Sequence, residues 1–241
     1  MSVEDSTTVV YLGDQSKSLK CRCFYQLNKN AVIAIILPPD PRYGGNIDND
    51  VVVTAEKAFR NCGLSTLAVN YHISNEEKNL VSVLDAAFFD VYTVLDWIFL
   101  NLPDVQGILL CGYSFGAYVA TVSAMRRPDV SYFVSVSPLV SQYDFSQMCP
   151  MLCEGAMIAG SQDEFIPSEP FDNIVSQMNE VNRSMVEKIV IDGANHKYKD
   201  KLSNLQEAIE NYVNIKLATR VVMPVRKKRR KRAKKNGEFN V

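Results

Sequence analysis

The chain has 241 residues, of which 47% are hydrophobic and 22% are charged, and its formal net charge is −1. This length favours one α/β domain with a sizeable core, and the composition is typical of a folded globular protein. The N-terminus has no basic start or long apolar run, and the longest aliphatic run has seven residues (31–37). A bilayer span needs roughly 20 residues, so we expect no secretory signal and no membrane helix, and a cytoplasmic location.

Short apolar runs alternate along the chain with segments of helical periodicity. The apolar runs predict strands at residues 21–27, 32–37, 66–71, 107–111, 132–136, 155–159 and 186–191. The periodic segments predict helices at residues 50–61, 81–100, 117–125, 170–179 and 201–217. This alternation indicates an α/β fold, with a mainly parallel sheet and helices on both faces. The expected domain is residues 1–220.

The C-terminal segment 221–241 contains a dense basic run. From Arg226 to Lys235, nine of ten residues are basic, and residues 1–225 hold 17 basic and 26 acidic residues. Such a run repels itself and has too little apolar surface to fold, so we expect a disordered tail. It could bind nucleic acid or an anionic membrane surface.

One segment carries a pattern typical of nucleophilic catalysis. A strand-like run leads into Gly112-Tyr113-Ser114-Phe115-Gly116, and a helical pattern follows. This is G-x-S-x-G between a strand and a helix, where the sharp turn exposes the serine hydroxyl at the end of the strand. Glycines flank the serine because side chains there would collide with the strand and the helix. Ser114 is therefore the predicted nucleophile.

A serine hydroxyl needs a base to take its proton, and the base needs a carboxylate to orient it. The chain has two histidines. His196 follows the serine, in a polar turn between the last strand and the last helix, and is the predicted base. Asp163 lies in the turn that follows the strand at 155–159 and is the predicted acid, with Glu164 as the alternative. The order Ser…Asp…His is that of α/β-hydrolase triads.

The tetrahedral intermediate of acyl transfer also needs backbone N–H donors. The N–H of Phe115, next to the nucleophile, is one candidate. The loop after the strand at 32–37 should supply the other, and Asp40 is the candidate because the two prolines before it have no N–H. Tyr43, His72 and Tyr113 are candidates for the substrate pocket.

Several of these segments resemble the small, cap-less α/β-hydrolases related to dienelactone hydrolases. A bacterial group of that family has the loop His-Pro-His-Pro-x-x-Gly-Gly, the helix start Asn-x-x-Val-Val, and Gly-x-Ser-Phe-Gly-Ala at the elbow. The corresponding segments here read Pro38-Pro-Asp-Pro-Arg-Tyr-Gly-Gly45, Asn49-Asp-Val-Val52 and Gly112-Tyr-Ser-Phe-Gly-Ala117. The resemblance spans residues 32–217. Both histidines of the first loop are replaced, which indicates a changed pocket around an unchanged triad.

Two functions are compatible with these residues. The first is a serine hydrolase that cleaves an ester or related acyl bond of a small-molecule substrate through an acyl-enzyme. It would act without a cofactor or metal, in an open site, because the segment 136–153 is too short for a helical lid. The second is a catalytically weak hydrolase-like scaffold that binds through its basic tail. The six cysteines are expected to be free thiols.

Overall fold

The computed structural model describes residues 8–12, 19–25, 32–72, 79–181 and 185–219. Its centre is an eight-stranded sheet with the order β1-β2-β4-β3-β5-β6-β7-β8. The first two pairs in this order, β1–β2 and β2–β4, are antiparallel, and all the others are parallel. The strands are β1 Thr8–Leu12, β2 Leu19–Phe24, β3 Val32–Leu37, β4 Ser65–Val69, β5 Gly107–Tyr113, β6 Val130–Val136, β7 Glu154–Gly160 and β8 Val186–Ile191.

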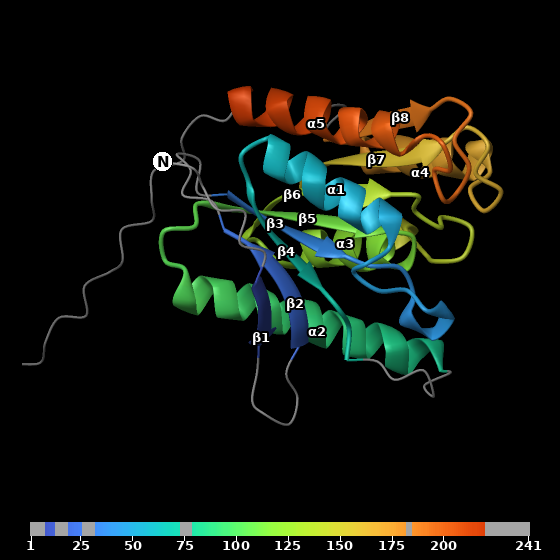
Figure 1. Cartoon of the computed structure of the whole chain (residues 1–241). Helices are drawn as coiled ribbons and strands as arrows, with labels where there is room; N and C mark the ends of the chain where they lie inside the picture. The colour runs from blue at the N-terminus through green and yellow to red at the C-terminus, as the bar shows by residue number, and fades with distance from the viewer. Residues whose placement is uncertain (1–7, 13–18, 26–31, 73–78, 182–184, 220–241) are drawn as a thin grey trace, which may run out of the picture.

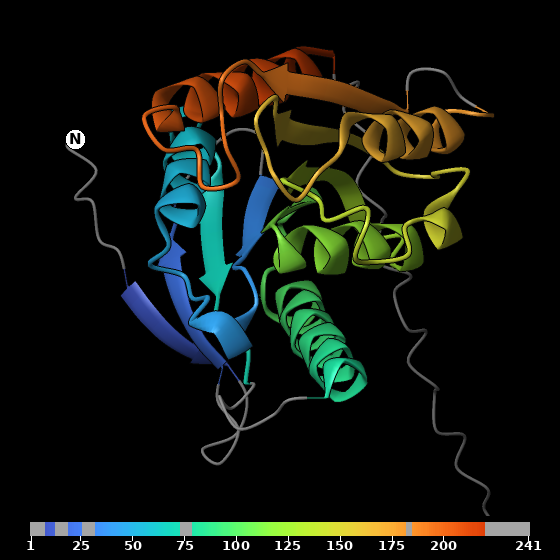
Figure 2. The ribbon, with the colours of Figure 1, turned by 90° about the vertical axis from the view of Figure 1, so that its right-hand side faces the viewer.

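Helices cover both faces of the sheet. The helices are α1 Asp50–Asn61, α2 Leu80–Asn101, α3 Phe115–Arg126, α4 Ser168–Met178 and α5 Leu202–Thr219, with short 3₁₀ turns η1 Pro41–Tyr43 and η2 Ser146–Met148. Figure 1 shows α1 and α5 together on one side and α2 on the other. In Figure 2, turned by 90°, α3 lies on the same side as α2. No helix in the described part of the chain is long and apolar enough to cross a membrane.

Two apolar clusters fill the spaces between the sheet and its helices. Strand β3 contributes to both, because successive side chains of a strand point to opposite faces. Its Ile33, Ile35 and Leu37 pack in the cluster with α2 and α3, whereas Ala34 and Ile36 pack in the cluster with α1 and α5. All six residues of β3 are buried. This two-sided burial explains why the central strands read as continuous apolar runs.

The sequence prediction of an α/β fold with helices on both faces is confirmed. Strands β3 and β8 and helix α1 have the predicted bounds, and the other predicted elements shift by a few residues. Strand β1 was not predicted. Strand β2 runs from Leu19 to Phe24, so it begins two residues earlier than the strand predicted at 21–27. Residues 26–27 of that prediction lie outside the described residues. The basic run 226–235 also lies outside them, so its disorder and its partner stay predictions.

The strand order brings the loops after β3 and β5 together. From β3 the chain proceeds to β4 on one side, and then returns to β5 on the other side of β3. Ligands of open parallel sheets bind at such a switch point, beyond the carboxyl ends of the strands. Leu37 and Gly112, at or near the ends of β3 and β5, are paired directly. The loop that carries Asp40 therefore lies beside the turn that carries Ser114.

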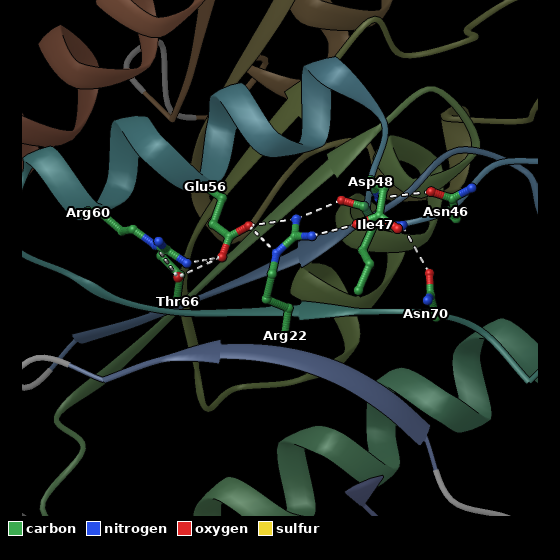
Figure 3. Close-up of polar contacts among 8 residues, drawn as sticks. All are labelled: Arg22, Asn46, Ile47, Asp48, Glu56, Arg60, Thr66 and Asn70. Carbon is green, nitrogen blue, oxygen red and sulfur yellow. Dashed lines mark hydrogen bonds and ion pairs between the residues drawn. The ribbon is translucent and has the colours of Figure 1, made fainter. Parts of the chain in front are cut away.

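A buried ion network fixes the far end of the loop after β3. Glu56 of α1 is 3% exposed, and its carboxylate accepts hydrogen bonds from Arg22 of β2 and from Arg60. The same Arg22 donates to the Ile47 carbonyl and the Asp48 carboxylate, both at 2.7 Å. Figure 3 shows Arg22 between α1 and the chain segment that precedes it. A charge pair from β2 and α1 thus holds the segment that links the β3 loop to α1.

We expect Glu56→Gln to lower the free energy of unfolding by about 2 kcal/mol, since it leaves two largely buried guanidinium groups without their shared anion. The matched control is Asp48→Asn, which removes an Arg22 partner whose side chain is 75% exposed. That variant should cost less than about 0.5 kcal/mol. Urea unfolding of both variants measures the difference, and equal losses would show that the network is not held by Glu56.

Candidate active site

Ser114 lies in a strained turn between β5 and α3. Its backbone has φ 57° and ψ −113°, a conformation that residues with a side chain rarely adopt. Gly112 and Gly116 make the turn possible. A Cβ at Gly112 would lie 1.9 Å from the Gly116 carbonyl oxygen, and a Cβ at Gly116 would lie 2.5 Å from the carbonyl oxygens of Leu37 and Pro38. The turn therefore holds the serine hydroxyl at the carboxyl end of β5.

The structure brings Ser114, His196 and Asp163 together, although 82 residues separate the serine from the histidine. His196 Nε2 lies 3.2 Å from Ser114 Oγ. On the other side of the ring, Nδ1 lies 3.0 and 2.9 Å from Oδ1 and Oδ2 of Asp163. The Asp163 side chain is fully buried, whereas 11% of the His196 side chain is exposed. This arrangement can pass a proton from the hydroxyl to the ring while the carboxylate stabilises the imidazolium.

Glu164, the alternative acid, does not contact the imidazole ring. One of its carboxylate oxygens lies 3.4 Å from the backbone nitrogen of His196 and accepts its N–H. Asp163 is the carboxylate that faces Nδ1, because it ends the tight turn after β7, in which its backbone N–H bonds to the Gly160 carbonyl. The geometry therefore favours Asp163 over Glu164 as the partner of the ring.

Two aromatic rings flank the His196 imidazole. Phe165 meets it edge to face with ring centroids 5.0 Å apart, and Tyr113 lies 5.4 Å away on a tilted plane. The Tyr113 hydroxyl donates to the His196 carbonyl at 3.0 Å. Burial raises the pKa of Tyr113, so the hydroxyl stays protonated as a donor. Tyr113 thus holds the loop that carries His196. Its hydroxyl group is already used in this bond, although Tyr113 was expected to line the substrate pocket.

The loop after β3 lies against the start of α3, where the two predicted oxyanion donors are found. Phe115 is the first residue of α3, a position whose N–H has no acceptor inside the helix. Asp40 caps η1 with its carboxylate, which accepts the backbone N–H of Arg42 at 2.9 Å and pairs with its guanidinium. The close approach of Gly116 to the Leu37 and Pro38 carbonyls places this loop against the start of α3. The roles of the Phe115 and Asp40 N–H groups remain predictions.

Tyr43 and His72, the other pocket candidates, lie in different surroundings. The Tyr43 side chain is largely exposed, beside the Arg42 guanidinium. His72 follows β4 and binds the buried Asp90 of α2 twice, through its backbone nitrogen at 2.7 Å and through Nδ1 at 3.1 Å. Burial raises the pKa of Asp90, and the two hydrogen bonds from His72 counteract this. The backbone nitrogen and the Nδ1 atom of His72 are therefore both engaged by α2.

Two residues near the triad were not predicted from the sequence. Ser137, just after β6, donates to Asp163 Oδ2 at 2.9 Å, and the Tyr198 hydroxyl lies 3.1 Å from Ser137 Oγ. The sequence did contain a signal for Ser137, because this residue directly follows a predicted strand. It therefore lies at the same carboxyl ends of the strands as Ser114 and Asp163. Tyr198 lies two residues after His196, but nothing in the local sequence shows that its side chain turns inward.

The described part of the chain holds no group of three or more His, Cys, Asp or Glu side chains that could bind a metal ion. All six cysteines are free thiols. Burial raises the pKa of several of them, that of Cys21 to about 12, so these thiols stay protonated and pack as small apolar groups. No cysteine contact takes part in the triad geometry described above.

Comparison with known proteins supports the fold. No family model matches the chain. An uncharacterized protein of Rickettsia prowazekii, RP471, is 29% identical over 208 residues, which cover 85% of this chain and 87% of that protein. A solved α-β serine hydrolase homologue from Coxiella burnetii superposes with a TM-score of 0.75 at 27% identity, over 86% of this chain and 97% of that one. The chain belongs to the α/β-hydrolase superfamily.

A second solved structure is relevant to the prediction that this chain has no cap. XC6422 from Xanthomonas campestris, described as an α/β serine hydrolase without a lid, matches 87% of this chain and 94% of that one. Its TM-score is 0.74 at 22% identity, which is a likeness of fold. In this α/β-hydrolase, the segment between β6 and β7 contains only the short turn η2 and no α-helix. The predicted cap-less form is thus confirmed.

Proposed function

We propose that this protein is a serine hydrolase that cleaves an ester or related acyl bond through an acyl-enzyme. One observation carries the proposal: Ser114 Oγ, His196 Nε2, His196 Nδ1 and the Asp163 carboxylate form one hydrogen-bonded series with steps of 3.2 and 2.9 Å. The strained backbone of Ser114 supports it, because such strain is maintained only where the surrounding structure enforces it. The resemblance to the Coxiella burnetii serine hydrolase homologue supports it further.

In the proposed reaction, each residue of the triad has one role. Ser114 Oγ bonds to the acyl carbon while its proton moves to His196 Nε2, and the carbonyl oxygen takes the electron pair of the broken π bond. The N–H groups of Phe115 and Asp40 would bind that oxyanion. The carbonyl re-forms, the leaving oxygen departs with the electron pair of the broken bond, and His196 returns the proton to it. Water then attacks the acyl-enzyme with the same assistance and frees the acid and Ser114.

The absence of a helix between β6 and β7 favours short acyl groups. A long acyl chain gains about 0.8 kcal/mol of binding free energy for each methylene that is buried. Burial of a long chain requires a part of the protein that covers it. We expect kcat/KM for p-nitrophenyl acetate and butyrate to exceed that for p-nitrophenyl dodecanoate by at least about tenfold.

Hydrolysis of this ester series at equal detergent concentration tests both parts of the proposal. The Ser114→Ala protein serves as the blank for non-enzymatic and surface-catalysed hydrolysis. A preference for the dodecanoate would contradict the open site. If folded wild-type protein hydrolysed no ester faster than the blank, the proposed function would be wrong.

A further inference from the structure

The Asp163 carboxylate is fully buried and accepts hydrogen bonds from three groups. These are His196 Nδ1–H, the Phe165 backbone N–H at 3.0 Å from Oδ1, and the Ser137 hydroxyl at 2.9 Å from Oδ2. A buried carboxylate remains ionised only where donors replace its lost hydration. The first donor, His196, belongs to the triad, and the second, Phe165, belongs to the turn that carries Asp163. Ser137 comes from a different strand end, and the reaction above gives it no role.

Ser137 is connected to both reacting ends of the triad. It follows β6, which lies between the strand that leads to Ser114 and the strand that leads to Asp163. The Ser114 backbone N–H donates to the carbonyl of Val136, the residue before Ser137, at 2.9 Å. Ser137 itself has φ 47°, and its N–H donates to the Ile158 carbonyl at 2.7 Å. A non-glycine residue at this φ is uncommon, and here it aims the hydroxyl at Asp163.

Tyr198 completes the arrangement from the histidine loop. Its side chain is fully buried, it also has a positive φ of 52°, and its hydroxyl lies 3.1 Å from Ser137 Oγ and 3.4 Å from the Ile158 carbonyl. An ionised carboxylate has no proton, so the single Ser137 proton goes to Asp163. Two acceptors are then within reach of the Tyr198 proton, and we assign it to Ser137 Oγ because that atom is nearer, at 3.1 Å against 3.4 Å for the Ile158 carbonyl. Burial raises the pKa of Tyr198, which keeps that proton in place.

We propose that Ser137 and Tyr198 are positioning residues for the triad, acting as a hydroxyl relay from Tyr198 to Ser137 to Asp163. The relay fixes the carboxylate with both oxygens toward His196 Nδ1. It also disperses the carboxylate charge, because the positive ends of two O–H dipoles point along the relay toward it. The inference rests on the proposed function in one respect, namely that His196 acts as the base.

Loss of the relay has a predictable electrostatic direction. Without the Ser137 hydroxyl, the negative charge on Asp163 is less dispersed and attracts the imidazolium form of His196 more strongly. The other groups that face Asp163 are Tyr113, which burial keeps neutral, and Glu164 on the adjacent turn position. Neither changes in the variants below. Protonation of the ring should therefore occur at higher pH, and the acidic limb of the pH–rate profile should move upward.

The test uses Ser137→Ala, Tyr198→Phe and the double variant of the full chain. Tyr212→Phe is the matched control, since Tyr212 is a buried tyrosine whose hydroxyl has no hydrogen-bond partner among the described residues. For p-nitrophenyl acetate, Ser137→Ala should lower kcat/KM about tenfold and move the acidic limb up by about half a pH unit. Tyr198→Phe should give a smaller change in the same direction, and the double variant should match Ser137→Ala, because Tyr198 acts through Ser137.

NMR titration of the two histidine rings gives a readout that does not need catalysis. The His196 signal should titrate at higher pH in Ser137→Ala than in wild type, while the His72 signal, an internal control bound to Asp90, should not move. An unmoved or lowered His196 titration in folded Ser137→Ala would overturn the relay, and so would additive effects in the double variant. A wild-type protein that hydrolyses no ester would refute the proposed function instead, and the ring titration would still decide the relay.

Discussion

Replacement of Ser114 by alanine should reduce kcat for ester hydrolysis by about 10⁴- to 10⁶-fold with little change in stability. The substitution removes the atom that would form the acyl-enzyme, so neither His196 nor Asp163 can assist the reaction. Ser114 is 8% exposed and its Oγ bonds to His196, while the turn around it is built by glycines that remain. Alanine also tolerates the backbone conformation about as well as serine. Steady-state rates with p-nitrophenyl acetate, at equal protein concentration, measure the loss.

Ser123→Ala is the matched control for this change. Ser123 is a buried serine of α3, the helix that follows Ser114, and its hydroxyl has no hydrogen-bond partner among the described residues. Its removal should leave the rate within about twofold of wild type. Similar rates for Ser114→Ala and wild type would show that any hydrolysis comes from another group or a contaminant.

The second large effect should come from Asp163→Asn, which we expect to lower kcat by about 10⁴-fold. Asparagine fills the same space, but its amide offers one acceptor atom where the carboxylate offers two. With the amide NH₂ toward the ring, Nδ1 becomes an acceptor, and Nε2 then carries the proton and cannot accept one from Ser114. The amide also lacks the charge that stabilises the imidazolium. The pH–rate profile of this variant should show partial recovery at high pH, where hydroxide replaces the base.

Glu164→Gln controls for the loss of one negative charge near the ring. Glu164 contacts the backbone nitrogen of His196 and not the imidazole, so this variant should lose less than about fivefold in kcat. If both variants lost activity equally, the acid would not be Asp163 alone, and the shared charge of the turn would be the relevant feature.

Those parts of the fold that bury both faces of a strand were predictable from the sequence. Strand β3 reads as one apolar run and has the predicted bounds. The turn at Ser114 was predictable because its glycines have no substitute, given carbonyl oxygens within 2.5 Å of the Cβ positions. His196 and Asp163 were predictable as expected site residues from their order and from the strand ends they follow. Their catalytic roles stay predictions until the variants above are measured.

Other features depend on contacts that local sequence does not encode. Strand β1 lies at the edge of the described sheet, where it pairs with β2, and its short run of five residues did not by itself indicate a strand. The Arg22–Glu56 pair joins residues 34 positions apart, and each alone looks like a surface charge. Ser137 and Tyr198 meet across 61 positions through two positive φ angles. Such pairs become visible only when the sheet brings its strand ends together.

The most direct test of the central claim is covalent labelling of wild-type protein with a fluorophosphonate, followed by mass spectrometry of its peptides. We predict one phosphonylated residue, Ser114, with labelling absent in Ser114→Ala and strongly slowed in Asp163→Asn. Unlabelled, folded wild-type protein, or an adduct on a different residue, would contradict the assignment of Ser114 as an activated nucleophile.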